Sequence, residues 1–222
     1  MPKSHFMLEY NLFLRVIADI VDGMGVRDLF SYFRLPTLRY KSASANEENM
    51  DRPYATEKPH LESWLGHSKN TITFHIPILG DVVNNYVKLF SPPDDYQETW
   101  SNPINDFLIG EEVASKYIAA DIKIQPGNLY LFEAVSLYAT VRTPDAGGRI
   151  STEMMGLLKD EADIEEFEVG EKTRELDYLI TPDSLLKIGR EVLFGPRNSL
   201  SGAIEKKVDL EIGDNLYSLI QN

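Results

Sequence analysis

Apolar residues recur at helical spacing near the start of the chain. Between Leu8 and Val21 most of them are three or four positions apart, which predicts an amphipathic helix, and Gly23 and Gly25 predict its end. A second, shorter helical stretch is expected at 26–33, and residues 37–41 have the composition of a strand. The first 36 residues are therefore expected to form a helical support.

The middle of the chain alternates apolar and polar residues, which is typical of half-buried strands. In the run 71–78 the apolar positions are Ile72, Phe74, Ile76 and Ile78. We expect these four side chains to be buried between or behind two facing antiparallel sheets. Further strands are expected at 86–90, 119–124, 128–132, 137–142 and 150–156.

Short, frequent strands separated by turn signals predict a fold that is mainly β with helical flanks. A double-stranded β-helix, that is, a jelly-roll or cupin-like barrel, fits this pattern best. The expected organisation is an N-terminal helical support (1–36), a jelly-roll core (37–158), an acidic linker (159–178) and a C-terminal helical or irregular extension (179–222). The linker has nine acidic residues against three basic ones between 159 and 177, so it is expected to be solvated.

Charge and composition narrow the classes of partner. The formal net charge of −13 makes nucleic acid and anionic membranes poor partners, because both attract positive charge. The chain has no cysteine, so thiolate metal sites and cysteine nucleophiles are excluded, and a reducing cytoplasm is the expected location. No signal peptide or membrane span is expected. We expect a small-molecule substrate, and a homodimer is a possible assembly.

One short motif has the residue types of a metal-binding site, and no other catalytic motif of comparable strength is found in the chain. His60 and Glu62 form a His-x-carboxylate pair, and residues i and i+2 of a strand project to the same face. Two histidines and one carboxylate are the expected ligands of non-haem Fe(II) oxygenases. The alternative is a surface strand with two polar residues pointing outward. No phosphate-binding loop, dinucleotide fingerprint or nucleophile elbow is present.

Several short runs together resemble a known family. In order and spacing they are similar to the 2-oxoglutarate/Fe(II) oxygenases of the phytanoyl-CoA dioxygenase superfamily, and most similar to the branch found in bacterial carbohydrate and aminoglycoside biosynthesis clusters. The resemblance covers about residues 55–156, and the flanks contribute nothing to it. The runs that carry it are 59–64, 76–78, 84–85, 131–133 and 148–151.

The resemblance implies how the co-substrate would be held. Arg149 would pair with the distal carboxylate of 2-oxoglutarate, a role that suits a guanidinium fork. Arg142 competes for this role, and Thr140 and Asn85 are further expected contacts of the co-substrate. The implied activity is Fe(II)- and 2-oxoglutarate-dependent oxidation, such as hydroxylation, of a small polar metabolite, for example a sugar or sugar-derived compound.

The resemblance also implies the iron ligands His60 and Glu62, but the third ligand departs from the pattern. The family has Leu-His-Gly-Thr where this chain has Leu-Tyr-Ala-Thr at 137–140, so Tyr138 takes the place of the distal histidine. A phenol binds iron well only as phenolate. Three outcomes stay open: tyrosinate is a ligand, two residues and waters hold the metal weakly, or the metal site is lost and a binding protein remains.

A cupin-like metalloenzyme is a further alternative, in which His75 completes the ligand set with His60 and Glu62. His75 lies on the polar face of its expected strand, so it could point into the mouth of the barrel. Together with Trp64 and Tyr86 it is a candidate for the substrate pocket. Aromatic residues in strands are more often part of the core.

Overall fold

The computed structural model describes residues 7–34, 36–43, 52–159, 179–183 and 185–186. The chain divides into two compact units. The first unit combines Met1–Pro36 with Met155–Asn222, and the second is Thr37–Met154. Most of the acidic linker expected at 159–178 and most of the C-terminal extension expected at 179–222 lie outside the described residues.

The first unit contains the predicted N-terminal helix. Helix α1 spans Met7–Gly23, which confirms the helical periodicity. Its buried residues are Leu14, Ile17, Ala18 and Val21, spaced three or four positions apart as the interior face of a helix requires. Among the described helices, none is long and apolar enough to cross a membrane.

The second predicted helix of this unit is wrong. Only Arg27–Leu29 is helical (η2), and Phe30–Arg34 forms strand β1. Strand β1 pairs antiparallel with residues 156–158 of β8 (Arg149–Leu158) and with β9 (Leu179–Ile180). The rings of Phe30 and Phe33 lie where a side chain at Gly156 would be, so burial against the neighbouring strand overrides the local helical pattern.

The second unit is mainly β, as predicted. One sheet has the order β6-β3-β8, and β2 also pairs with β8. The other sheet has the order β5-β4-β7. The strands are β2 (Thr37–Lys41), β3 (Thr71–Gly80), β4 (Asn85–Ser91), β5 (Ile118–Ala119), β6 (Tyr130–Glu133), β7 (Leu137–Arg142) and β8. Of the strand expected at 119–124, only Ala119 lies in a strand, as the last residue of β5.

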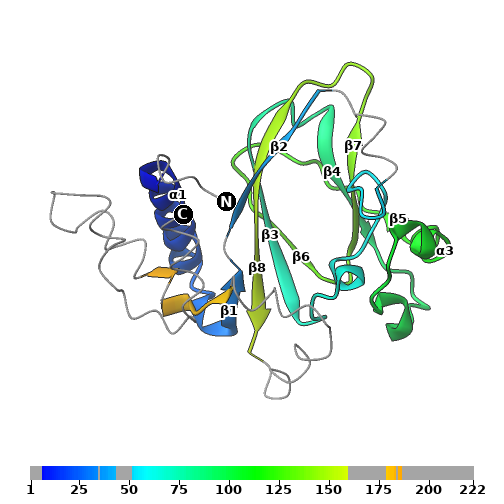
Figure 1. Cartoon of the computed structure of the whole chain (residues 1–222), viewed down its shortest axis with the longest axis horizontal. Helices are drawn as coiled ribbons and strands as arrows, with labels where there is room; N and C mark the ends of the chain where they lie inside the picture. The colour runs from blue at the N-terminus through cyan, green and yellow to red at the C-terminus, as the bar shows by residue number, and fades with distance from the viewer. Residues whose placement is uncertain (1–6, 35, 44–51, 160–178, 184, 187–222) are drawn as a thin grey trace, which may run out of the picture. The chain divides into compact units, whose positions relative to one another are not determined.

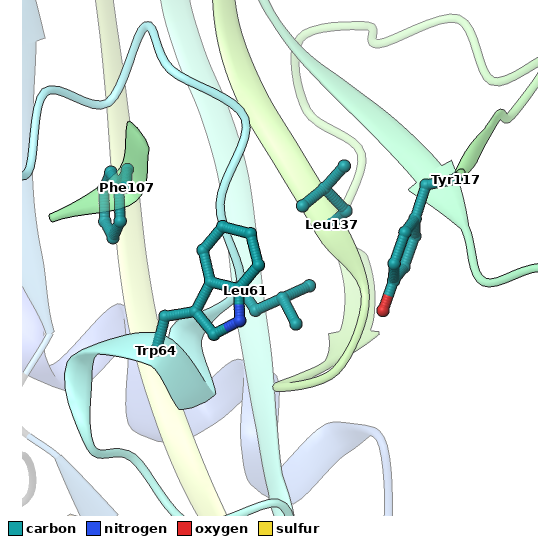
Figure 2. Packing of buried hydrophobic residues seen from close by; sticks show 5 residues of the cluster. All are labelled: Leu61, Trp64, Phe107, Tyr117 and Leu137. Atoms are coloured by element: carbon teal, nitrogen blue, oxygen red, sulfur yellow. The ribbon is translucent and has the colours of Figure 1, made fainter. Parts of the chain in front are cut away.

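Three short 3-10 helices and one short α-helix connect these strands. They are η3 (Glu62–Leu65), η4 (Glu98–Ser101), η5 (Phe107–Gly110) and α3 (Glu111–Ala114). An apolar cluster joins these segments to β7, on the side of β7 that faces away from Tyr138. Its buried members are Leu61, Trp64, Phe107, Tyr117 and Leu137 (Figure 2).

The two sheets of this unit face each other (Figure 1). Phe132 of β6 lies against Tyr138 of β7, with 5.2 Å between the ring centroids. Val87 and Leu89 of β4 belong to the same buried cluster. Aromatic and aliphatic contacts across the gap thus join the sheets, which confirms the expectation of two facing antiparallel sheets.

The expected interior face of β3 is wrong in part. The fully buried side chains include Thr73 and His75, on the polar face, whereas Ile78 is 39% exposed. Of the expected apolar set only Phe74 is buried, and Ile72 and Ile76 are half-buried. On this polar face, His75 meets a polar partner inside, because its Nδ1 contacts Glu153 of β8.

Candidate functional site

His60 and Tyr138 lie side by side in the second unit. The backbone N–H of His60 donates to the carbonyl of Tyr138 at 2.9 Å, and the reverse bond is 3.0 Å long. This is an isolated bridge and not a strand, and Glu62 already belongs to η3. The geometry differs from the expected strand arrangement of His60 and Glu62, and it is Tyr138 that links these two residues.

The imidazole of His60 is held in one orientation. Its Nδ1 donates to the carbonyl oxygen of Lys58 at 2.7 Å, since a carbonyl can only accept. The ring stacks on Phe107 with 4.3 Å between centroids and an interplanar angle of 11°. Burial lowers the pKa of His60 from 6.5 to about 4, so the ring is neutral at physiological pH and Nε2 carries the lone pair.

Glu62 and Tyr138 are bonded to each other. The Tyr138 hydroxyl donates to Oε1 of Glu62, and both side chains are buried. The second carboxylate oxygen of Glu62 lies 3.5 Å from Nε2 of His67. Burial raises the pKa of Glu62, and burial together with the Glu62 and Glu153 carboxylates raises the pKa of Tyr138 well above 10. The phenol therefore keeps its proton at neutral pH.

These donors do not form a three-ligand metal centre. Within the described part of the chain, no three His, Cys, Asp or Glu side chains are grouped so that they could hold a metal ion. His75 therefore does not complete a ligand set with His60 and Glu62. The phenol of Tyr138 donates a hydrogen bond to Glu62 and has a raised pKa, which opposes the phenolate that iron binding needs.

His75 belongs to a different group, formed by β2, β3 and β8. Its Nδ1 lies 3.2 Å from Oε1 of Glu153, and Oε2 of Glu153 lies 2.6 Å from Nε of Arg39. The Arg39 charge and the His75 bond lower the pKa of Glu153 to about 2, although burial opposes this. Neither Arg39 nor Glu153 is among the site residues expected from the sequence. The alternation of Arg149, Ser151 and Glu153 along one strand could have indicated Glu153.

The two candidate arginines differ in what they contact. Arg142 donates from Nη1 to Oε1 of Glu57 at 2.7 Å and from Nε to the carbonyl of Ser42 at 3.1 Å. Lys41 also approaches Glu57, at 4.0 Å. Arg142 is thus engaged by an internal carboxylate.

Arg149 is 1% exposed and lies on the interior face of β8, opposite Lys41 of β2. Its Nε and Nη1 are buried, and they have no hydrogen-bond partner among the described residues. Burial lowers the pKa of Arg149 to about 10, and the charges of Arg142 and Arg39 add to the effect. It remains a cation at neutral pH, and two of its donors are open to an anionic ligand.

Asn85 and Thr140 are buried, on the face of their sheet that carries Tyr138. The side-chain amide nitrogen of Asn85 lies 3.1 to 3.3 Å from the carbonyl oxygens of Lys41, Ser42 and Gly147. These contacts tie the ends of three segments together. The backbone N–H of Thr140 donates to Thr56 at 2.7 Å.

The other two expected pocket residues lie elsewhere. Trp64 is part of the apolar cluster, where its ring occupies the space beside Gly110 and its Nε1 donates to the carbonyl of Trp100 at 2.6 Å. Tyr86 is half-buried, on the face of β4 opposite to Val87 and Leu89. Both positions indicate packing, because neither side chain shares the interior with Arg149.

No protein-family model and no curated protein matches the chain. Among solved structures, an N-substituted L-amino acid dioxygenase from Burkholderia ambifaria is similar at 18% identity and a TM-score of 0.38, over 57% of this chain and 50% of that one. The non-haem alpha-ketoglutarate-dependent epimerase SnoN from nogalamycin biosynthesis is similar at 12% identity and a TM-score of 0.35, over 66% and 52%. The chain thus spans about half the length of each.

Proposed function

We propose that the second unit binds a small dicarboxylate of the 2-oxoglutarate type between its two sheets, on a jelly-roll scaffold related to the 2-oxoglutarate oxygenases. Arg149 carries this proposal. It is a fully buried guanidinium with two nitrogens that have no partner in the described chain. An anion is the ligand that such a site favours, because a guanidinium fork holds a carboxylate through two parallel hydrogen bonds.

The neighbourhood of Arg149 supports the same ligand. Arg142 already has Glu57, and Arg39 already has Glu153, so each of these cations has its own carboxylate. Ser151, two residues along the strand, has a buried hydroxyl without a partner in the part of the chain that is described. A ligand carboxylate could therefore meet a guanidinium and a hydroxyl on one face of β8.

Iron-dependent oxidation is not part of this proposal, because the donor set does not fit Fe(II). A facial triad needs three donors, and the third position holds the protonated phenol of Tyr138. We therefore favour a binding protein that has exchanged the metal for the hydrogen bond between Glu62 and Tyr138.

Oxidation of a small polar metabolite, such as a sugar-derived compound, is the second candidate. The orientation of His60 favours it. A backbone carbonyl accepts from Nδ1, so Nε2 keeps a lone pair that can bind a metal, as in many metal-ligating histidines. In that case His60 and Glu62 would hold Fe(II), and the metal with its co-substrate would supply the oxidising chemistry. Tyr138 would have to give up its proton.

Calorimetry with the full chain tests the first candidate. With a chelator present, 2-oxoglutarate should bind to the wild type. Arg149→Ala should raise its Kd by about two orders of magnitude or more, since breaking a buried charged pair costs about 3–5 kcal/mol. Arg149→Lys keeps the charge without the fork and should lose less. Arg27→Ala removes an exposed arginine of the first unit and should have no effect.

Two results would contradict this assignment. Unchanged affinity in Arg149→Ala would remove the arginine from the site. Conversion of 2-oxoglutarate to succinate by the wild type with Fe(II) would favour the oxygenase.

A further inference from the structure

Three side chains from three strands form a chain of contacts on the interior face of the β6-β3-β8 sheet. Arg39 of β2 contacts Glu153 of β8, and Glu153 contacts His75 of β3, at 2.6 and 3.2 Å. Glu153 and His75 are both buried, and the side chain of Arg39 is 36% exposed. A carboxylate held on one side by a cation and on the other by an imidazole fixes the direction of that imidazole.

The contact with Glu153 decides which ring nitrogen of His75 carries a proton. An ionised carboxylate only accepts hydrogen bonds, and the pKa of Glu153 is about 2, so Nδ1 of His75 must donate. In the neutral imidazole, Nε2 is then an acceptor. This Nε2 is buried and has no hydrogen-bond partner among the residues described.

Other polar atoms on the same face also lack partners within the described chain. They are the hydroxyls of Thr73 and Ser151 and two nitrogens of Arg149. Thr73 is two residues from His75 on β3, and Ser151 lies between Arg149 and Glu153 on β8, so all these side chains point to one side. Buried polar groups are rarely left without partners, so several of them on one face are typical of a ligand-binding site.

We propose that His75, positioned by Glu153 and Arg39, accepts a hydrogen bond from a ligand hydroxyl, so that the site prefers a 2-hydroxy dicarboxylate to the corresponding 2-oxo acid. This inference rests on the proposed function, because Arg149 must hold a carboxylate of the same ligand. The 2-oxo group has no hydrogen to donate, and its oxygen would face the lone pair of Nε2. The 2-hydroxy group differs from the 2-oxo group by one O–H donor, and Nε2 of His75 can recognise that hydrogen.

The matched ligands 2-oxoglutarate and the two enantiomers of 2-hydroxyglutarate test the preference. Their affinities for the full chain are measured by calorimetry in chelator. One enantiomer should bind about tenfold more tightly than 2-oxoglutarate, the effect of one hydrogen bond gained and one repulsive contact avoided. His75→Phe should bring the ratio of the two affinities close to one.

Glu153→Gln gives the sharper test, because it should reverse the preference. The amide oxygen of the new side chain would face Arg39, which only donates, and its NH2 group would donate to Nδ1 of His75. Nε2 would then carry the proton and favour the 2-oxo oxygen. A loss of packing alone would weaken the binding of both ligands and leave the ratio of their affinities unchanged. Glu133→Gln makes the same change on an exposed side chain of β6 and should not alter the ratio.

The outcomes separate the two proposals. Tight binding of 2-oxoglutarate with no preference for either hydroxy acid overturns the role of His75 and leaves the carboxylate site intact. Absence of binding by all three ligands overturns both proposals. The wild-type comparison decides by itself if a variant fails to fold.

Discussion

Replacement of Tyr138 by Phe removes one hydroxyl from the buried site and nothing else. That hydroxyl donates to a carboxylate that is 2% exposed. Hydrogen bonds to charged groups contribute about 1.5–3 kcal/mol to stability. Tyr138→Phe should therefore lower the free energy of unfolding by about that amount at neutral pH, which corresponds to a fall in Tm of about 3 to 12 °C for a chain of this size.

The loss should also depend on pH, because Glu62 is the acceptor. Burial raises the folded-state pKa of Glu62 above its ordinary value of 4.5. At a pH between the unfolded-state and folded-state pKa values, the folded chain therefore binds more protons than the unfolded one. Stability attributable to Glu62 is thus greatest at low pH and falls as pH rises through this window. Without the phenol, which favours the charged form, the pKa rises further, and the destabilisation should be larger at pH 7.5 than at pH 5.

Urea unfolding at these two pH values, followed by circular dichroism, provides the measurement. Tyr117→Phe is the matched control, because Tyr117 is also a buried residue but its hydroxyl donates to the neutral carbonyl of Val135 at 3.2 Å. The control should lose about 0.5–1.5 kcal/mol at both pH values. If Tyr138→Phe lowers the free energy of unfolding no more than the control does, or lowers it equally at both pH values, the hydrogen bond to an ionised Glu62 is not present.

Two further predictions concern the same site. Tyr138→His should strengthen Fe(II) binding, measured by calorimetry under anaerobic conditions, and create or raise 2-oxoglutarate turnover, because neutral imidazole binds metal without losing a proton; an active wild type with an inactive variant would instead identify tyrosinate as a ligand. For His60, whose pKa is lowered from 6.5 to about 4, the unfolded chain binds more protons between these values, so stability should rise with pH across that range by at most about 3 kcal/mol. His60→Phe should flatten that rise in urea unfolding, and an unchanged slope would refute the assignment.

Periodicity predicted the regular elements well where burial follows one face. The helix at 7–23 and the strands β2, β3, β4 and β7 lie close to their expected bounds. The error at 26–33 arose because Phe30 and Phe33 have helical spacing, and a register irregularity in β1 between Phe30 and Tyr32 brings both rings against Gly156. Only the long-range pairing with β8 distinguishes the strand from a helix, and a local pattern does not contain it.

The interior face of β3 shows a different limit. Alternation identifies two faces, and the apolar face was expected to be the buried one. In the second unit the polar face is buried, because Glu153, 78 residues further along the chain, meets His75 there. A sequence shows that His75 is polar but not that a distant carboxylate will orient it.

The choice between Arg142 and Arg149 has the same origin. Both are arginines on adjacent segments near a glycine-rich turn, so spacing does not separate them. The structure distinguishes them by the location of Glu57. This carboxylate accepts a hydrogen bond from Arg142, whereas two nitrogens of Arg149 have no partner in the described chain. Partners in space, and not residue types, thus decide which cation remains to bind a ligand.

The charges inside the second unit also favour an anion over a metal ion. The cationic side chains discussed above outnumber the carboxylates, and one of those carboxylates, Glu62, has a raised pKa. A divalent cation would enter this surplus of positive charge and would displace the proton of Tyr138, whereas a dicarboxylate would neutralise the surplus. The groups are Arg39, Lys41, Arg142 and Arg149 against Glu57, Glu62 and Glu153. Any metal that binds beside His60 should consequently bind more tightly when the dicarboxylate is already present, since the ligand supplies the negative charge that the site lacks.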